Sequence, residues 1–376
     1  MANRNLTAAK RAKNDEFYTQ YHDIEKEINA YIDYNPDVFK GKTLLLPCDD
    51  PEWSNFTKFF AQNFERFKLK KLISTSYAVE SKLYKGGHQV TIFEESAPQY
   101  DSSKTRTKGK IFTLTRDISG DGKIDVDDLE WNYLEGDGDF KSDEVKALRN
   151  EADIIITNPP FSLFRDFLAW ILEANKQFVI IGSKNIITYK EVFPLIMENK
   201  MWVGSTSFSK DMLFIPPEEI DPSEYSPSAT RTVNGVVYLR SPSVWYTNLD
   251  HGRRHQPLKL MSMHDNLRFH KKIKEQKSYF EYDNYDAIEI PFTDSIPSDF
   301  DGMMAVPISF LDKYNPEQFE ILGITQRNDD PYKTKQYTTS EYPNANDLNA
   351  RGVIIIDGKP KSMYARVLIK HRKPAK

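Results

Sequence analysis

The sequence predicts an α/β fold in which helices cover both faces of a largely parallel sheet. Short apolar runs of strand length, such as Thr43–Leu46 and Gln177–Gly182, alternate with longer segments that have helical spacing. These runs are apolar throughout, as is typical of strands buried on both faces. Strands that alternate with helices are joined by crossover connections, which makes the sheet parallel and the domain three-layered. In such folds the ligand site lies at the carboxyl ends of the strands.

The predicted elements follow one another up to residue 182. A first helix reaches Phe39, because apolar residues from Phe17 to Ile32 recur near helical spacing. Pro47 ends the first strand. After residue 163, apolar residues recur at i, i+3, i+4, i+7 and i+8, which predicts an amphipathic helix. The expected strands are Thr43–Leu46, Leu72–Ser76, Ala152–Thr157 and Gln177–Gly182, the later helices are Trp53–Phe67 and Phe164–Leu172, and an inserted hairpin spans Val90–Thr115.

The chain of 376 residues is long enough for two domains. The alternation of strands and helices fades near Asn248. His251–Lys277 is then basic with scattered aromatic residues, and Tyr279–Pro307 is aromatic and acidic. We therefore expect a first domain over residues 1–250 and a second, smaller domain over residues 251–376.

Composition excludes several classes of protein. Hydrophobic residues make up 39% of the chain and charged residues 28%, which excludes collagen-like and wholly disordered sequences. The longest apolar runs fall far short of the ~20 residues of a membrane helix, and residues 1–13 are polar, so we expect neither a membrane span nor a secretory signal. The single cysteine, Cys48, cannot form an internal disulfide. The expected location is the cytoplasm.

Charge is distributed unevenly along the chain, although the net charge is only -4. Residues 1–13 carry four basic residues and no acid, residues 251–277 carry eight against two acids, and residues 358–376 carry seven and no acid. A basic surface of this kind suits contact with phosphates. We expect DNA phosphate contacts from Arg253, Arg254, Lys271 and Lys272. The alternative is that these charge runs are solvated faces or tails.

One short motif indicates a catalytic site. Asn158, Pro159, Pro160 and Phe161 stand between the strand Ala152–Thr157 and the amphipathic helix. Two prolines force an extended turn, which holds the Asn158 side chain and the Pro159 carbonyl rigidly. Two acceptors aimed at the N–H bonds of an exocyclic amine free its lone pair to attack a methyl group, and Phe161 supplies a flat surface for the base. The alternative is an ordinary proline-rich turn.

A second motif lies in the acidic stretch. Five residues occupy the oxygen-ligand positions 1, 3, 5, 9 and 12 of a twelve-residue calcium loop, with Gly122 at the sixth position; they are Asp117, Ser119, Asp121, Asp125 and Asp128. The segment before this loop has strand character, whereas a calcium-binding hand begins with a helix. A structural calcium ion and a solvated Asp/Gly loop are both compatible with this pattern.

The chain resembles the EcoRI-type adenine-specific DNA methyltransferases over most of its length. The resemblance rests on Asn158–Phe161 together with four further segments, Asp15–Gln20, Leu45–Phe56, Trp245–Leu249 and Phe310–Gly323. It implies a Rossmann-like catalytic domain over 1–250, a target-recognition region over 251–376, and transfer of a methyl group from S-adenosylmethionine to N6 of adenine in double-stranded DNA. A cognate restriction endonuclease is the genetic partner that it suggests.

The resemblance also implies a cofactor site. The element that packs on the methionine end of S-adenosylmethionine corresponds to Phe17, Tyr18 and Thr19. The loop after the first strand corresponds to Pro47, Asp49 and Asp50. The pair that binds the adenine ring of the cofactor corresponds to Asp139 and Phe140. This chain lacks the usual glycine-rich turn after the first strand. At the end of the second strand, where this chain has Ser74–Tyr77, there is no evident acidic residue to bind the ribose of the cofactor.

Other functions use the same chemistry. An RNA base N-methyltransferase or a protein-glutamine methyltransferase would employ the same Asn-Pro-Pro-aromatic geometry on a planar amine or amide. A catalytically silent protein that binds nucleic acid or calcium is an alternative of another class. The residues outside the catalytic motif favour DNA.

Overall fold

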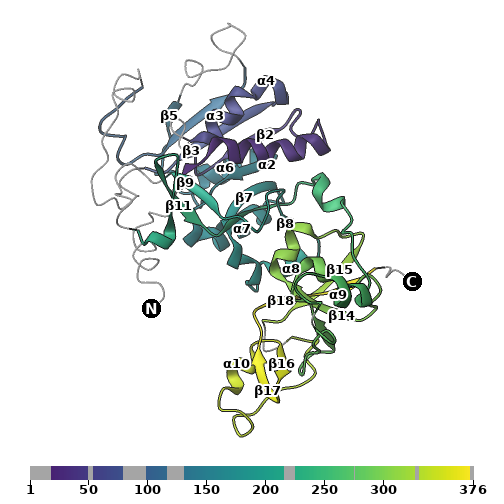
Figure 1. Ribbon diagram of the computed structural model, residues 1–376. Helices are drawn as coiled ribbons and strands as arrows, with labels where there is room; N and C mark the ends of the chain where they lie inside the picture. Colours follow the sequence, from purple (N-terminus) through teal and green to yellow (C-terminus); the bar gives the residue numbers. More distant parts are fainter. Residues whose placement is uncertain are drawn as a thin grey trace. The chain divides into compact units, whose positions relative to one another are not determined.

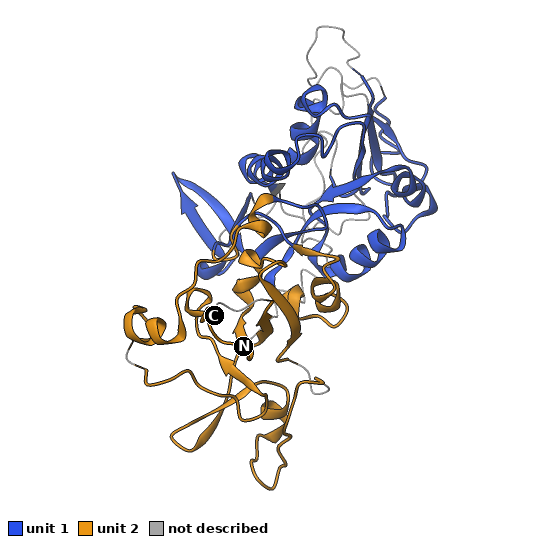
Figure 2. Cartoon of the chain, turned by 90° about the vertical axis from the view of Figure 1, so that its right-hand side faces the viewer, with its two compact units in different colours: residues 1–184, 203–206, 210–251 blue, residues 185–202, 207–209, 252–376 orange. Residues whose placement is uncertain are grey.

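The computed structural model describes residues 18–49, 54–78, 99–116, 131–215, 225–274, 276–326 and 330–372 (Figure 1). The chain divides into two compact units (Figure 2). Unit 1 comprises residues 1–184, 203–206 and 210–251, and unit 2 comprises residues 185–202, 207–209 and 252–376. Two short segments from within the first 250 residues thus belong to unit 2. Among the described residues, no helix has the length and apolarity that crossing a membrane requires.

The main sheet of unit 1 is mixed. Its strand order is β5-β4-β3-β2-β6-β7-β12-β8. These strands are β2 (Thr43–Leu46), β3 (Lys71–Ser76), β4 (Lys110–Leu114), β5 (Trp131–Tyr133), β6 (Ile154–Thr157), β7 (Gln177–Ser183), β8 (Trp202–Val203) and β12 (Ser243–Thr247). The central strands β3, β2, β6 and β7 are parallel, as predicted. The expectation is wrong toward the edges, where β4, β5 and β12 pair antiparallel.

Helices cover both faces of this sheet. On one face lie α2 (Tyr21–Tyr34), α3 (Asn55–Gln62) and α4 (Phe64–Phe67), and on the other α6 (Asp143–Glu151) and α7 (Phe164–Glu173). The first helix ends at Tyr34, earlier than predicted. The expected helix Trp53–Phe67 breaks at Asn63, because the Asn63 side-chain amide donates to the carbonyl of Phe59 at 2.8 Å and competes with the helical backbone bonds.

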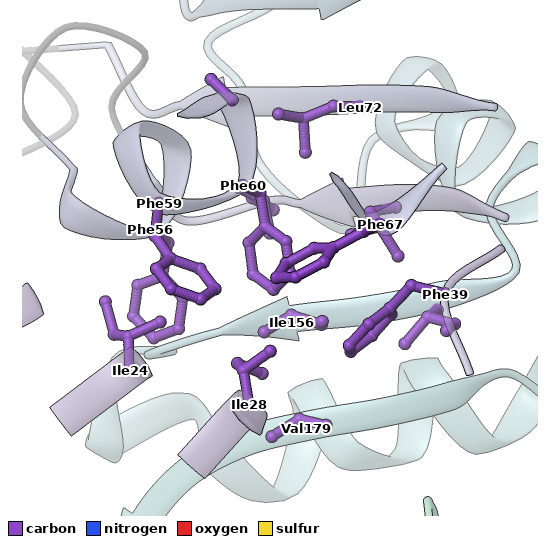
Figure 3. Packing of buried hydrophobic residues seen from close by; sticks show 14 of the residues in the cluster. Ile24, Ile28, Phe39, Phe56, Phe59, Phe60, Phe67, Leu72, Ile156 and Val179 are labelled. Carbon is purple, nitrogen blue, oxygen red and sulfur yellow. The ribbon is translucent and has the colours of Figure 1, made fainter. Parts of the chain in front are cut away.

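Phenylalanines form the centre of the unit 1 core (Figure 3). The rings of Phe59 and Phe60 meet edge to face with centroids 5.2 Å apart, and Phe39 lies 5.6 Å from Phe67. Ile28 of α2 faces the same cluster. Full burial of one such side chain is worth ~1.5–3 kcal/mol, so the cluster fixes α2, α3 and α4 against the sheet.

A buried carboxylate holds the segment 204–206 in unit 1. Glu27 of α2 is fully buried and accepts hydrogen bonds from the Tyr31 hydroxyl at 2.7 Å and from the backbone N–H groups of Ser205 at 2.7 Å and Thr206 at 2.9 Å. Gly204 leaves no room for a side chain here, since an added Cβ would lie 2.2 Å from Glu27 Oε1.

A second, antiparallel sheet in unit 1 has the order β1-β9-β11-β10. It consists of β1 (Tyr18–Thr19), β9 (Met212–Ile215), β10 (Thr230–Val233) and β11 (Val236–Ser241). Asn234 and Gly235 join β10 to β11 with φ of 51° and 81°, as a type I′ turn requires. This sheet brings the N-terminal strand β1 into the core of unit 1 through its neighbour β9, whose Phe214 is fully buried.

Unit 2 contains a four-stranded sheet, a separate hairpin and short helices. The sheet order is β13-β14-β18-β15, formed by β13 (Ala287–Glu289), β14 (Met303–Pro307), β15 (Phe319–Ile324) and β18 (Arg366–His371). The hairpin pairs β16 (Val353–Ile356) with β17 (Lys359–Ser362). The α-helices are α8 (Phe193–Met197), α9 (Met263–Phe269) and α10 (Ala345–Asn349).

Candidate functional site

Two predicted site segments and the end of β3 lie at the carboxyl ends of the central parallel strands of unit 1. Asp49 follows β2, Asn158 follows β6, and Tyr77 follows β3 in the sheet order β3-β2-β6. Asp49 and Asn158 are only 5% and 7% exposed. The edge that open parallel sheets use for ligands therefore carries these two polar residues, shielded from bulk water.

Asp49 bonds to two neighbouring segments. One carboxylate oxygen accepts the Ser54 hydroxyl at 2.6 Å and the other accepts the Thr157 hydroxyl at 2.6 Å. Its backbone N–H donates to the carbonyl of Thr75 at 3.0 Å. Asp49 thus joins the start of α3 to the end of β6, directly before Asn158.

The start of α3 connects this network to strand β1. Ser54 caps α3 by accepting the N–H of Phe56 at 3.1 Å, and the Asn55 side chain donates to the carbonyl of Thr19 at 2.8 Å. The Thr19 hydroxyl is buried and, within the described part of the chain, has no hydrogen-bond partner. A buried polar atom without a partner is costly, so this hydroxyl is suited to meeting a bound ligand.

Buried hydroxyl groups stand at the end of β3, where the usual acid is missing. Ser74 donates to the carbonyl of Asp49 at 2.5 Å and lies 2.8 Å from the Thr57 hydroxyl, and Thr75 donates to the carbonyl of Pro47 at 3.2 Å. These hydrogen bonds hold the loop after β2, which contains Pro47 and Asp49 in place of a glycine-rich turn. The sequence analysis did not identify Ser54, Thr57, Ser74 and Thr157 as site residues; the run of hydroxyl side chains Ser74–Ser76 is the one signal that could have indicated a polar strand end.

The turn after β6 is buried, and its Pro160 has an extended backbone with φ of -53° and ψ of 123°. Asn158, Pro159 and Pro160 are buried, and the carbonyl of Pro160 accepts the N–H of Leu163 at 2.9 Å. Phe161 begins a short 3-10 helix, Phe161–Leu163, which leads into α7. Its half-buried ring meets Phe214 edge to face at 6.4 Å.

The loop 136–139 packs closely on the end of β3. Gly138 has φ of 84°, and an added Cβ there would lie 2.3 Å from the carbonyl oxygen of Ser76. The N–H of Ala78 donates to the carbonyl of Asp137 at 2.8 Å. Burial and the neighbouring Asp139 carboxylate raise the pKa of the Tyr77 hydroxyl, which stays protonated. Asp139 therefore lies at the same sheet edge as Asp49 and Asn158.

Phe140 is a core residue in this structure. It is 2% exposed, and its ring packs edge to face on Phe167 at 5.2 Å and Trp170 at 5.6 Å, both from α7. The predicted contact of Phe140 with the cofactor's adenine ring stays a prediction. Its packing instead anchors the loop that carries Asp139.

Arg253 and Arg254 have partners inside unit 2. Arg254 is 6% exposed, and its guanidinium bonds to Asn199 and stacks on the ring of Trp202 at 3.7 Å. Arg253 Nη2 lies 3.1 Å from Asp312 Oδ2. We therefore correct the expectation that Arg254 faces phosphates, since a buried guanidinium stacked on an indole stabilises the fold. Lys271 and Lys272 are exposed, as a phosphate contact requires.

Several predicted residues lie outside the described part of the chain. These are Phe17, the side chain of Tyr18, Asp50, and the candidate calcium ligands Asp117, Ser119, Asp121, Asp125 and Asp128. The described residues contain no cluster of His, Cys, Asp and Glu suited to a metal ion. The calcium loop stays a prediction.

Comparison with known proteins gives consistent matches over nearly the whole chain. A family model described as adenine-specific methyltransferase EcoRI matches residues 5–372. Type II methyltransferase M.EcoRI of Escherichia coli is 38% identical over 99% of this chain and 97% of its own. M.MpnI of Mycoplasma pneumoniae is 32% identical over 97% of each chain, and M.MgeORF184P of Mycoplasma genitalium is 33% identical over 96% and 97%. No solved structure gives a significant match.

The Asp49 network predicts a loss of stability in one conservative variant. Thr157→Val keeps the side-chain shape but removes a hydroxyl that bonds to a buried carboxylate, so we expect the free energy of unfolding to fall by ~1–3 kcal/mol. Thr232→Val, on the exposed face of β10, should change it by less than ~0.5 kcal/mol. Urea denaturation followed by tryptophan fluorescence measures both, and equal midpoints would contradict the role of Thr157.

Proposed function

This chain belongs to the family of the adenine-specific methyltransferase EcoRI, and we propose that it transfers a methyl group from S-adenosylmethionine to N6 of adenine at a specific site in double-stranded DNA. The observation that carries the proposal is the rigid turn Asn158–Phe161 at the carboxyl end of a central parallel strand, next to the Asp49 network. Unit 1, with its parallel centre, is the proposed Rossmann-like catalytic domain.

The proposed chemistry depends on position more than on a strong base. The Asn158 side-chain oxygen and the Pro159 carbonyl accept the two N–H bonds of the target amine, which draws the nitrogen toward tetrahedral geometry. Phe161 stacks on the extruded base and aligns the amine for in-line attack. Because Asn158 is buried, these dipoles act in a site of low dielectric, where they stabilise developing charge most strongly.

The residues at the sheet edge fit the cofactor that a methyltransferase uses. When bound, S-adenosylmethionine supplies an electrophilic methyl group. Asp49 would hold its ammonium group, because its carboxylate stands at the carboxyl end of β2 and can pair with a positive charge. The unpartnered Thr19 hydroxyl would line the methionine end, with Pro47 shaping the loop. Asp139 would accept the adenine amine.

Unit 2 is the proposed target-recognition region. Its exposed Lys271 and Lys272 are proposed phosphate contacts, while Arg254 is buried on Trp202 and the half-buried Arg253 pairs with Asp312. The adenine specificity of the family argues against a protein-glutamine acceptor. A cognate restriction endonuclease stays a prediction.

The proposed function is tested by transfer of labelled methyl groups. The purified chain should label duplex DNA, and digestion to nucleosides should yield N6-methyldeoxyadenosine. The same assay with RNA and with protein substrates tests the alternatives. Label in RNA or protein, with none in DNA, would refute the proposal.

Asn158→Ala should slow methyl transfer strongly and leave cofactor affinity largely unchanged, because it removes an acceptor for the reacting amine. Removal of one preorganised hydrogen-bonding group from an enzyme active site typically lowers the rate by ~10²- to 10³-fold. We therefore expect a loss of ~10²- to 10³-fold in the single-turnover rate constant. Asn132→Ala, on the exposed side of β5, is the matched control. A rate constant for Asn158→Ala close to that of this control would rule out the proposed role of Asn158.

The enzyme should extrude its target adenine, since N6 of a stacked, paired base cannot reach a buried turn. With 2-aminopurine at the target position, we expect fluorescence to rise as protein binds. Fluorescence that stays constant at saturating protein, on DNA that is still methylated, would contradict extrusion.

A further inference from the structure

The hairpin β10–β11 forms a basic arm of unit 1 beside the proposed catalytic turn. Figure 1 shows β11 next to β9, and Phe214 of β9 meets the ring of Phe161. We propose that the outer half of this hairpin, residues 231–238, contacts the DNA duplex next to the target adenine, with Arg231 on a phosphate and the turn Asn234–Gly235 in a groove. The inference rests on the proposed function, because the partner is the substrate of that reaction.

The outer half of the hairpin is a two-stranded ribbon. In the described structure β11 pairs with β9 at residues 239–241, whereas residues 236–238 pair with β10 alone. A Cβ added at Gly235, in the closing turn, would meet nothing within 4 Å beyond its own neighbours in the chain. Every residue from 230 to 238 is exposed or half-buried. The ribbon therefore stands free of the core, and the major groove of B-form DNA, ~12 Å wide, admits such a ribbon.

One face of the ribbon carries the groups that suit DNA. Arg231 lies opposite Tyr238, and Val233 lies opposite Val236. Because side chains alternate along a strand, these two pairs share one face. None of the four is buried, and Val236 is 50% exposed. The other face leads into the core through Leu239, so a ligand has to approach the face that carries Arg231.

The charge of the arm selects its partner. Residues 230–241 contain two arginines and no acidic residue. Arg240 pairs with Asp211, with Nε 2.6 Å from Oδ2, whereas the exposed Arg231 has no carboxylate partner within the described part of the chain. A guanidinium binds two phosphate oxygens at once. Because the arm stands beside the turn proposed to hold the target base, the phosphates that approach it are those of the substrate duplex.

The base of the arm is fixed within unit 1. Asp211, directly before β9, accepts Lys184 Nζ at 2.8 Å in addition to Arg240. The backbone N–H of Lys184, directly after β7, donates to the carbonyl of Pro242 at 2.8 Å. These bonds join the base of the arm to the main sheet. A preorganised element loses little conformational freedom when it binds.

The charge of the arm is tested by binding of the full chain to two short duplexes, measured by fluorescence anisotropy over a series of salt concentrations. One duplex carries the site that the wild-type enzyme methylates, identified by sequencing methylated plasmid DNA, and the other carries a scrambled site. Arg231→Gln should weaken binding to both duplexes and reduce the log–log salt slope by ~0.9, the value for one lost phosphate contact. Arg66→Gln is the matched control and should keep the wild-type slope, since the exposed Arg66 lies on α4, which leads into the amino end of β3.

The length of the arm tests its contact with a groove. Deletion of residues 232–233 and 236–237 removes two residue pairs, retains the turn Asn234–Gly235 and keeps Arg231 opposite Tyr238. Contacts to base edges specify the sequence, whereas phosphate contacts position the protein. The shortened arm should therefore bind the site duplex ~5- to 150-fold more weakly, as expected for lost contacts to one base pair. Its salt slope and its affinity for the scrambled duplex should stay near those of the wild type.

Circular dichroism and the affinity for S-adenosylmethionine verify that each variant is folded and that its cofactor site is intact. A wild-type salt slope in Arg231→Gln, or wild-type discrimination between the two duplexes by the shortened arm, would overturn the assignment of this surface. Neither result would affect the identity of the methylated nucleoside, which tests the proposed function separately.

Discussion

The carboxylate of Asp49 connects parts of the site that are distant in sequence. It accepts hydroxyl groups from Ser54, which caps α3, and from Thr157, 108 residues further along the chain. Because Asn158 follows Thr157 directly, the position of the turn Asn158–Phe161 depends on the same bonds that shape the loop after β2. The proposed binding sites for the target base and for the cofactor are therefore positioned by the same carboxylate. This suits a mechanism that depends on the alignment of the two reactants.

Local patterns predicted the elements of unit 1 well. The strand Thr43–Leu46 forms at the predicted residues, and the strands around residues 154 and 177 and the turn at Asn158 form nearly as expected, because continuous apolar runs and paired prolines act locally. Strand direction at the sheet edges was not predictable, since apolar spacing is the same in both directions. The hydroxyl network around Ser74 was not predictable either, because its partners are brought together only by the folded sheet.

Runs of charged residues predicted the structure less well than runs of apolar residues. The sequence around residue 253 indicates a basic surface, yet Trp202 and Asn199 bury Arg254, and Asp312 pairs with Arg253. A charge becomes available to a ligand only where the fold leaves it without an internal acceptor. By this criterion Lys271 is a better candidate than the arginines, whereas the exposed Lys272 has its ammonium 4.2 Å from the centre of the Phe292 ring.

The two units are interleaved along the chain, which passes between them at five junctions, after residues 184, 202, 206, 209 and 251. A fragment beginning at residue 252 would lack α8 and the groups of Ser207 and Phe208 that donate to Asp312. The proposed recognition region is therefore not a module that can be exchanged at one splice point. A chimera with altered sequence specificity would have to carry residues 185–202 and 207–209 along with the C-terminal part.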